Sequence, residues 1–335
     1  MSAAPSELLA LINGFQVSQA ISVITTLGIP DLLHDGAQGC SALAAATGSH
    51  PRPLYRLLRA LAAVGILKED NERRFSLTSL GELLRSDVAS SQSAWARLLG
   101  RPMYRRAWSG LLESVRTGEV AFDRVHGMSV WDFRARHPEE AEAFDSAMAA
   151  IADQIADAVL SAYDFGQYRT IVDVGGGHGS FITRILQAHR RMRGVLFDQP
   201  HVVQVASSRL HGAGLTDRCE VVGGDFFQSV PPNADGYILK WILHDWDDDD
   251  AIAVLKSCRR GFHADGRLIV VEYLIGEPNL GLEGKLMDLN MMVITGGAER
   301  TREEYAAIFQ AAGFRLVRVV PTRTPIAVIE ASAVA

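Results

Sequence analysis

The sequence predicts an α/β protein in which a doubly wound sheet fills the second half of the chain and helices dominate the first half. From Arg169 onward, short runs of β-branched residues alternate with helical patterns, which is typical of a mostly parallel sheet covered by helices on both faces. One run, Leu268-Ile269-Val270-Val271, is apolar at every position, as expected of a strand buried on both faces. The expected strands are Ile171–Val174, Val195–Phe197, Glu220–Val222, Tyr237–Leu243, Leu268–Glu272, Phe314–Val320 and Ile326–Glu330.

The first expected element is a helix between Leu8 and Leu27, where apolar residues recur on nearly every side. A helix of this kind has to be buried all round. Either its own domain or a second subunit could bury it. We favour the second subunit, so the sequence predicts a homodimer.

Two more helices and a hairpin are expected next. Apolar spacing predicts helices over Cys40–Thr47 and Arg52–Val64, and a polar turn divides a hairpin over residues 66–77. This order is a winged-helix pattern, which often binds DNA. The formal net charge of the 335 residues is −6, so a dimerisation and substrate-covering module is favoured over nucleic-acid binding. The expected recognition region has only three cations, Arg52, Arg56 and Arg59.

Residues 94–160 are expected to be mainly helical and to end in a long amphipathic helix over Glu139–Leu160, with Phe144 and Met148 on one stripe. From Arg169 onward the alternating pattern of strands and helices begins. The predicted domains are a winged-helix-like dimerisation domain (1–100), a helical connector and pocket wall (101–160) and a Rossmann-like domain (161–335).

The cysteines and the N-terminal residues indicate in which cellular compartment the protein is expected. The three cysteines are widely spaced, which argues against a disulfide framework or a structural zinc site and favours reduced thiols. No basic residue precedes the first apolar stretch, so it does not resemble a signal peptide, and no uninterrupted apolar run predicts a membrane-spanning helix. A cytoplasmic protein that binds neither membranes nor nucleic acid is expected.

A glycine-rich turn, Asp173-Val174-Gly175-Gly176-Gly177-His178-Gly179, follows the first expected strand. Glycines at this place let the backbone approach a ligand at the carboxyl edge of the sheet. The turn fails the dinucleotide fingerprint because Ser180 occupies its last glycine position. Taken alone, it is compatible with a dinucleotide or with S-adenosylmethionine.

Acidic residues at the next two strand ends favour a nucleoside ligand. Asp198 ends the second strand, where a carboxylate can accept both ribose hydroxyls. Asp225 and Phe226 end the third, where the carboxylate can accept from the adenine amine and the ring offers a stacking face.

These motifs, together with the run Lys240-Trp241-Ile242-Leu243-His244-Asp245-Trp246, resemble the caffeic-acid and acetylserotonin type of O-methyltransferases. Bacterial polyketide-tailoring methyltransferases belong to the same group. The resemblance covers nearly the whole chain and implies S-adenosylmethionine as cofactor, a dimerisation domain and a place in secondary-metabolite or antibiotic biosynthesis. The candidate cofactor-binding residues are Asp173, Gly175, Gly177, Asp198, Asp225, Phe226, Lys240 and Trp246.

His244 is the candidate general base because it follows an expected strand at the ligand edge of the sheet. A neutral imidazole with a pKa near ~6.5 can accept the proton of an attacking hydroxyl, whereas a phenol with a pKa of about 10 is not deprotonated beforehand. The resemblance implies that Glu272 and Glu299 flank this histidine and support it. A surface pair with Arg300 or Arg302 is the alternative for Glu299.

An apolar, closed substrate pocket is expected, because removal from water strengthens the attraction between the reacting groups. The candidate lining residues are Phe144, Met148, Asn290 and Met291. The acidic run Asp247–Asp250 could bind magnesium, but a helix start is favoured and no metal is predicted.

The predicted function is therefore that of an S-adenosylmethionine-dependent O-methyltransferase acting on a hydroxyl of a small aromatic or polyketide-type molecule. Two alternatives stay open. One is a methyltransferase-like hydroxylase or decarboxylase of polyketide tailoring, and the other is a winged-helix transcriptional regulator.

Overall fold

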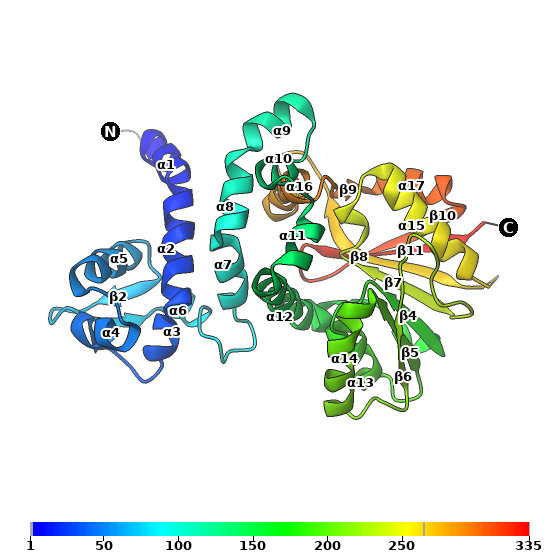
Figure 1. Cartoon of the computed structure of the whole chain (residues 1–335), viewed down its shortest axis with the longest axis horizontal. Coiled ribbons are helices and arrows are strands. Elements are labelled where there is room, and N and C mark those ends of the chain that lie inside the picture. The colour runs from blue at the N-terminus through cyan, green and yellow to red at the C-terminus, as the bar shows by residue number, and fades with distance from the viewer. Residues whose placement is uncertain (1–2, 264, 335) are drawn as a thin grey trace. The chain divides into compact units, whose positions relative to one another are not determined.

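The computed structural model describes residues 3–263 and 265–334 and divides into two compact units (Figure 1). One unit comprises Met1–Arg106 and Pro138–Ala150, and the other comprises Ala107–His137 and Ile151–Ala335. The boundaries fall inside the helices α8 (Pro102–Ser109) and α12 (Pro138–Ala162). The predicted long helix over Glu139–Leu160 is confirmed as α12.

The single N-terminal helix expected between Leu8 and Leu27 is wrong. Two helices, α1 (Ala3–Ile12) and α2 (Gly14–Thr26), meet at Asn13. Asparagine and glycine are poor helix formers, so Asn13-Gly14 is the place where the helix breaks. No single helix in the described part of the chain is long and apolar enough to span a membrane, but Pro5–Ile12 and α2 pass together on length and composition, with a 46° bend between them.

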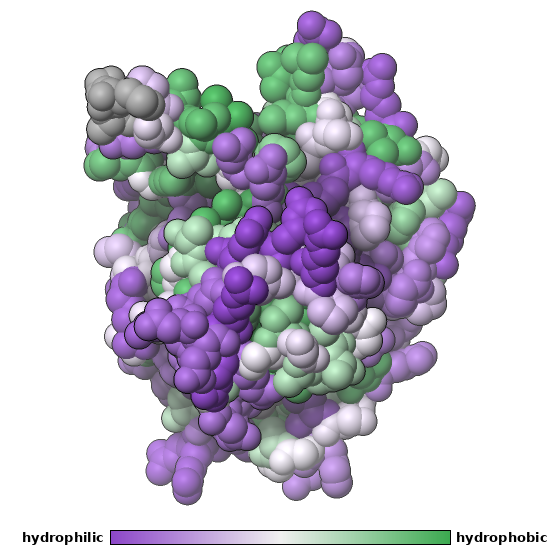
Figure 2. Space-filling view, turned by 90° about the vertical axis from the view of Figure 1, so that its left-hand side faces the viewer, coloured by the Kyte–Doolittle hydropathy of each residue, from purple (hydrophilic) through white to green (hydrophobic). Residues whose placement is uncertain are grey.

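Within one chain the segment is only partly buried, as expected if a second subunit covers the rest. Ile24 of α2 is fully buried, whereas the apolar side chains nearer the N-terminus are exposed. Hydrophobic residues gather on the surface at the upper left of Figure 2, around these helices. The exposed residues are Leu8, Leu9, Leu11, Ile12 and Phe15, each with more than half of its surface accessible.

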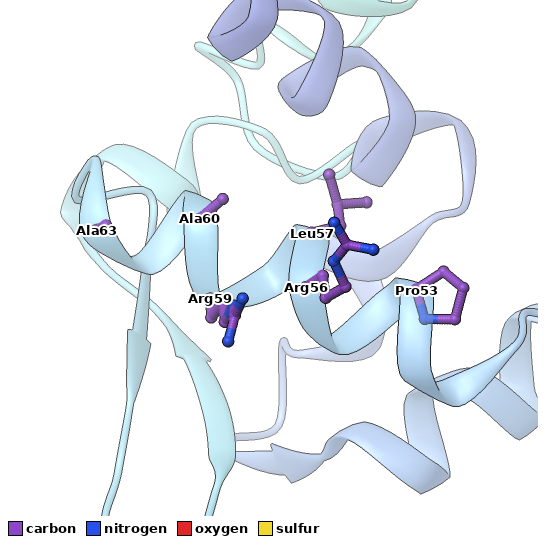
Figure 3. Close-up of a pocket in the computed structure, with 6 residues that line it drawn as sticks. All are labelled: Pro53, Arg56, Leu57, Arg59, Ala60 and Ala63. Atoms are coloured by element: carbon purple, nitrogen blue, oxygen red, sulfur yellow. The ribbon is translucent and has the colours of Figure 1, made fainter.

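The winged-helix elements are confirmed. Helices α4 (Cys40–Thr47) and α5 (Pro51–Ala63) precede a hairpin of β2 (Leu67–Glu69) and β3 (Arg74–Leu77). Leucines on one face of α5 pack with the fully buried Phe75 in a common core. On another face of α5 lies a surface pocket that contains none of the predicted site residues (Figure 3). Its lining residues are Pro53, Arg56, Leu57, Arg59, Ala60 and Ala63.

The remaining short elements complete the helical half of the chain. A two-residue strand, β1 (Gln38–Gly39), pairs with β3. The other helices before α12 are α3 (Ile29–Leu32), α6 (Ser79–Glu82), α7 (Ser93–Gly100), α9 (Leu111–Thr117), α10 (Ala121–His126) and α11 (Val130–Arg136).

Within the described residues, the second unit holds a mostly parallel sheet of eight strands in the order β10-β11-β8-β7-β4-β5-β6, with β9 paired to β8. The five neighbouring strands β8, β7, β4, β5 and β6 run parallel to one another. β11 pairs with β8 in the antiparallel sense, and β10 pairs with β11 in the same way. The bounds are β4 (Thr170–Val174), β5 (Arg193–Asp198), β6 (Cys219–Gly223), β7 (Gly236–Lys240), β8 (Arg267–Ile275), β9 (Arg300–Thr301), β10 (Phe314–Pro321) and β11 (Ile326–Ala333).

The strand that leads to His244 is shorter than predicted. The strand expected over Tyr237–Leu243 ends at Lys240, because Trp241 has a φ of +57° and leaves the sheet. Residues Leu243–Asp245 then form a short 3₁₀ turn, η2. His244 therefore lies on a tight turn beyond the carboxyl end of β7.

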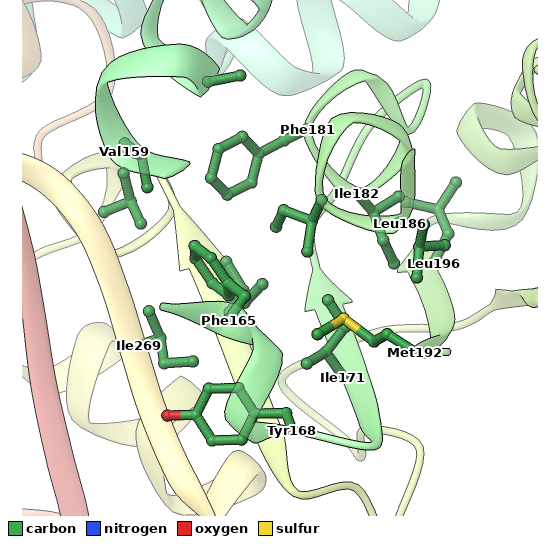
Figure 4. Packing of buried hydrophobic residues seen from close by; sticks show 14 of the residues in the cluster. Val159, Phe165, Tyr168, Ile171, Phe181, Ile182, Leu186, Met192, Leu196 and Ile269 are labelled. Atoms are coloured by element: carbon green, nitrogen blue, oxygen red, sulfur yellow. The ribbon is translucent and has the colours of Figure 1, made fainter. Parts of the chain in front are cut away.

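Helices cover both faces of the sheet, as the alternating pattern predicted (Figure 1). Ile171 faces a core with α13 (Ser180–Ala188) and α14 (Pro200–Gly212), and Figure 4 shows it beside Met192. The neighbouring Val172 faces the opposite core. The helices that pack there are α15 (Asp248–Gly261) and α17 (Arg302–Ala311). After β6 the chain returns to the other side of β4, so the carboxyl ends of β4 and β7 border a switch point in the strand order, where such sheets bind ligands.

Candidate active site

The glycine turn after β4 has the open geometry that a ligand needs. Gly175 and Gly177 have φ angles of +70° and +58°, which residues with a side chain rarely adopt. A Cβ on Gly175 would lie 2.3 Å from Cδ1 of Ile242, whereas a Cβ on Gly177 would meet no atom within 4 Å. The backbone at Gly177 therefore faces open space, and the turn fits a nucleoside cofactor at this edge.

Two of the predicted acids lie near this turn. Asp198 is beside it, and Asp225 follows the end of the next strand but one. The carboxylate of Asp198 accepts the backbone N–H of Gly177 at 2.7 Å, which fixes it against the glycine turn. Asp225 follows β6, is exposed, and accepts the backbone N–H of Phe227 at 2.9 Å. Phe226 has a ring atom 3.8 Å from the position of a Cβ on Gly175. The fold thus brings Asp198, Gly175, Gly177 and Phe226 to one edge.

An aromatic cluster adjoins Phe226. The ring of Trp246 packs edge-on against Phe227, with 4.8 Å between centroids, and against Phe226 at 6.1 Å. Trp131 of α11 stacks on Trp246, with centroids 5.7 Å apart and planes inclined by 17°. Sequence reasoning missed Trp131 because a lone tryptophan in a helical connector carries no motif.

Asp173 is a buried carboxyl group behind the turn, and the half-buried Lys240 interacts with it electrostatically. A Cβ on Gly176 would lie 2.7 Å from the carboxylate of Asp173, so this side chain lies directly behind the glycines. Among the described residues, neither carboxylate oxygen has a hydrogen-bond partner. Burial raises the pKa of Asp173 to about 7, although the charge of Lys240 opposes the shift. Burial likewise lowers the pKa of Lys240, whose ammonium lies 4.6 Å from the centre of the Trp241 ring.

His244 is buried and is hydrogen-bonded to Glu299. Its Nδ1 lies 2.7 Å from Oε1 of Glu299, whose side chain is fully buried and therefore does not form the alternative surface pair with Arg300 or Arg302. The backbone N–H of Glu299 donates to Asp288 at 3.0 Å, which anchors its segment to α16 (Leu282–Ile294). The second ring nitrogen, Nε2, lies 3.9 Å from Asp245.

Glu272 contacts the backbone of the η2 turn, which carries His244. Its Oε2 accepts the hydroxyl of Tyr305. Its Oε1 accepts three consecutive backbone N–H groups, those of Ile242 at 2.9 Å, Leu243 at 2.7 Å and His244 at 3.3 Å. Of the two acids expected to flank the imidazole, Glu299 touches the ring and Glu272 holds the turn that carries it.

The surroundings of His244 make it a stronger base than a free imidazole. Burial disfavours its charged form, but the charges of Glu299 and Asp245 and the hydrogen bond to Glu299 outweigh burial and raise the pKa of His244 to about 9. The expected pKa near 6.5 is therefore too low for this structure.

The candidate substrate residues fall into both units. On α16, Met291 and Asn290 are buried, and the Asn290 carboxamide oxygen accepts the indole N–H of Trp108 at 3.0 Å. Phe144 and Met148 are half-buried residues of α12 that belong to the first unit. Their part in a pocket stays a prediction.

The acidic run after Trp246 begins a helix, as favoured from the sequence. Asp247 accepts the backbone N–H of Asp250 at 2.9 Å and caps α15. Asp248 pairs with Arg300 at 2.9 Å. Within residues 3–263 and 265–334, no group of three His, Cys, Asp or Glu side chains is placed to hold a metal ion.

Comparisons with known proteins agree with this geometry. The model of the O-methyltransferase domain matches residues 108–315, and that of the O-methyltransferase dimerisation domain matches residues 9–87. The chain is 43% identical over 326 residues to the phenazine O-methyltransferase PhzM of Lysobacter antibioticus, which covers 97% of this chain and 95% of that protein.

Two further relatives show the range of the family. The crystal structure of human N-acetylserotonin methyltransferase with S-adenosylmethionine superposes with a TM-score of 0.92 at 28% identity, covering 100% of this chain and 99% of that one. The aclacinomycin 10-hydroxylase RdmB of Streptomyces purpurascens is 34% identical over 314 residues, covering 92% of this chain and 84% of that protein. The family matches, together with the glycine turn and the buried His244–Glu299 pair, establish that the chain belongs to the S-adenosylmethionine-dependent O-methyltransferases of the caffeic-acid and acetylserotonin type.

Proposed function

We propose that this enzyme methylates a hydroxyl on a small aromatic or polyketide-type secondary metabolite, with His244 as the general base. The observation that carries the proposal is the 2.7 Å contact between Nδ1 of His244 and Glu299. This contact commits Nδ1 to the carboxylate and leaves Nε2 as the nitrogen turned away from it. The names of relatives such as the phenazine O-methyltransferase and the mitomycin 6-O-methyltransferase support an aromatic substrate.

The residues around His244 perform the proton transfer. When bound, S-adenosylmethionine supplies an electrophilic methyl group on a positively charged sulfur, and that charge disfavours an imidazolium nearby. Nε2 of His244 takes the hydroxyl proton as the substrate oxygen attacks, and Glu299 stabilises the imidazolium that forms. The carboxylate of Glu299 raises the pKa of His244 and so favours proton transfer from a phenol, whereas the charge of the bound cofactor opposes it.

The same edge of the sheet would hold the cofactor. Gly175 and Gly177 would let its amino-acid part approach the backbone, and Asp198 would accept the ribose hydroxyls. Asp225, Phe226 and Trp246 would surround the adenine. Asp173 and Lys240 would set the charge behind the turn.

Asn290 and Met291 would line the substrate side of the site. The carboxamide oxygen of Asn290 is committed to Trp108, so its amide nitrogen, 3.9 Å from the weakly accepting sulfur of Met287, would donate to a substrate acceptor. We infer that substrates with an acceptor near the methylated hydroxyl are preferred.

An assay with methyl-labelled S-adenosylmethionine and a panel of phenols and hydroxylated polyketides tests the function. Label in an ether product is expected. An unlabelled, hydroxylated product would contradict methyl transfer and favour the activity that the name of RdmB describes. An unlabelled, decarboxylated product would contradict it in favour of the decarboxylase alternative.

Asp198→Ala is expected to weaken S-adenosylmethionine binding about 10- to 100-fold, because a charge-assisted hydrogen bond contributes about 1.5–3 kcal/mol. Titration calorimetry measures this affinity. Asp217→Asn, an exposed change beside β6, is the matched control. Equal affinities for Asp198→Ala and the native enzyme would refute the ribose contact.

The exposed apolar side chains of α1 and α2 would be covered by a second copy of the chain. They fall largely within residues 9–87, which match the dimerisation domain. Leu11→Asp is expected to convert the dimer to a monomer, because Leu11 is 77% exposed in one chain and a buried charge would disrupt its partner surface. Sedimentation velocity measures the change, with the exposed Val205→Asp on α14 as control. A native monomer, or a dimeric Leu11→Asp variant, would contradict the proposal.

The domain limits at residues 100 and 160, the cytoplasmic location, and the lack of membrane or nucleic-acid binding stay predictions. Helix α5 does present Arg56 and Arg59 at its surface pocket (Figure 3). A gel-shift assay with genomic DNA fragments tests the regulator alternative, and no shift is expected.

A further inference from the structure

Two buried side chains of opposite charge hold the turn that carries His244. A 3₁₀ turn of three residues cannot satisfy its own terminal N–H and C=O groups. Glu272 accepts the N–H groups on one side, as described above. Arg300 donates to the carbonyl groups on the other side, so the turn is bound through its backbone in both directions.

Arg300 is 2% exposed and is fully engaged. Its Nη1 donates to the carbonyl of Leu243 at 2.9 Å, and its Nη2 donates to the carbonyl of Trp246 at 2.9 Å. Its Nε donates to Asp248 at 2.9 Å. The two carbonyls bracket His244, one residue before it and two residues after it.

Arg300 also follows Glu299 directly in the chain. The guanidinium therefore ties the segment that carries the carboxylate to the turn that carries the imidazole. The two segments are in close contact elsewhere, because a Cβ on Gly297 would lie 2.0 Å from the carbonyl oxygen of His244. Arg300 is therefore one of the contacts that hold the turn at His244 against the segment that carries Glu299.

We propose that Arg300 is a positioning residue for methyl transfer, which sets the register of His244 against Glu299 by binding the carbonyls of Leu243 and Trp246. The proposal rests on the proposed role of His244 as base. Arginine suits this role because its planar fork presents several N–H groups in fixed directions, whereas lysine offers a single rotating ammonium. A base displaced by about 1 Å can lose roughly 100-fold in rate.

Arg300→Lys keeps the charge and removes the fork. We expect kcat to fall about 10- to 100-fold, while KM and the Kd of S-adenosylmethionine stay within about threefold. The matched control is Arg302→Lys, a change of an exposed arginine in the same segment, which should leave all three constants unchanged. The downfield proton resonance of the His244 Nδ1–H, identified by its loss in His244→Gln, should shift or broaden in Arg300→Lys only.

A milder variant guards against misfolding of Arg300→Lys. Asp248 is the exposed partner of the guanidinium, with 69% of its side chain accessible, and Asp248→Asn should lower kcat about 2- to 5-fold at unchanged cofactor affinity. Asp249→Asn, its exposed neighbour, is the control.

The outcomes separate this proposal from the assignment of the base. Full activity of His244→Gln would overturn the proposed base itself. An inactive His244→Gln beside native kcat in folded Arg300→Lys would overturn only the positioning role. If Arg300→Lys fails to fold, a kcat of Asp248→Asn equal to that of the native enzyme would overturn the positioning role of Arg300. Parallel loss of kcat and cofactor affinity, with an unshifted imidazole resonance, would also reject it in favour of a general structural role.

Discussion

Replacing His244 with alanine is expected to lower kcat by about 10²–10⁴-fold, the usual contribution of a general base. The affinity for S-adenosylmethionine should change little, because His244 contacts Glu299 and Asp245 and none of the candidate cofactor residues. Turnover should not vanish, since holding the oxygen and the methyl group in line can supply roughly 7–11 kcal/mol without a base.

Single-turnover kinetics and titration calorimetry on the same preparation measure the two effects separately. His211→Ala, an exposed histidine of α14, is the matched control. Removing His244 leaves the Glu299 carboxylate buried without its partner, so a melting temperature has to accompany the kinetics. Native turnover in folded His244→Ala would remove the base from the mechanism.

The parallel sheet and the glycine turn could be predicted because they are written in local patterns. Alternating apolar runs predict strands whatever surrounds them, and Asp173 to Gly179 form a contiguous motif. Asp198 was placed correctly at the end of β5 because strand ends in a parallel sheet meet at one edge.

The turn at His244 could not be predicted from local patterns. Tyr237–Leu243 is apolar enough to continue as a strand, yet it ends at Lys240. The groups that hold the turn, Glu272 and Arg300, lie about 30 and 55 residues further along the chain, so no local pattern records their contacts. The same distance explains why Glu299 could be assigned to the imidazole only by resemblance.

For the N-terminal helices, the sequence predicted that their apolar residues need cover and favoured a second subunit as its source. Apolar residues on every side predicted burial, and the structure of one chain leaves Leu11 and Phe15 exposed. A sequence records that such residues need cover but does not record which molecule supplies it.

Glu299→Gln is expected to shift the pH dependence of kcat to lower pH and to lower its plateau. Activity rises with pH as His244 loses its proton. The charge of Glu299 is the leading contribution that raises the pKa of His244 to about 9, with further contributions from Asp245 and Glu272. Without that charge the midpoint moves toward the ordinary imidazole value of about 6.5.

The plateau falls because the same charge stabilises the imidazolium formed as the hydroxyl proton is taken. Glutamine can still accept the Nδ1–H, so geometry is kept and the loss reports the missing charge, which we expect to cost about 10–10³-fold in kcat. Glu303→Gln, an exposed acid in the same segment, is the control for both effects.

Below the midpoint of the native enzyme, the lower midpoint of Glu299→Gln raises its relative activity, whereas its lower plateau reduces it. As pH falls, the native enzyme loses its neutral imidazole first, so the ratio of native to variant kcat should shrink between about pH 9 and pH 6.5 and stay constant below that range. An unchanged midpoint with a lower plateau would show that Glu299 only orients the ring. An unchanged plateau with a lower midpoint would show that no imidazolium forms in the rate-limiting step, and His244 would then have to act by binding the hydroxyl.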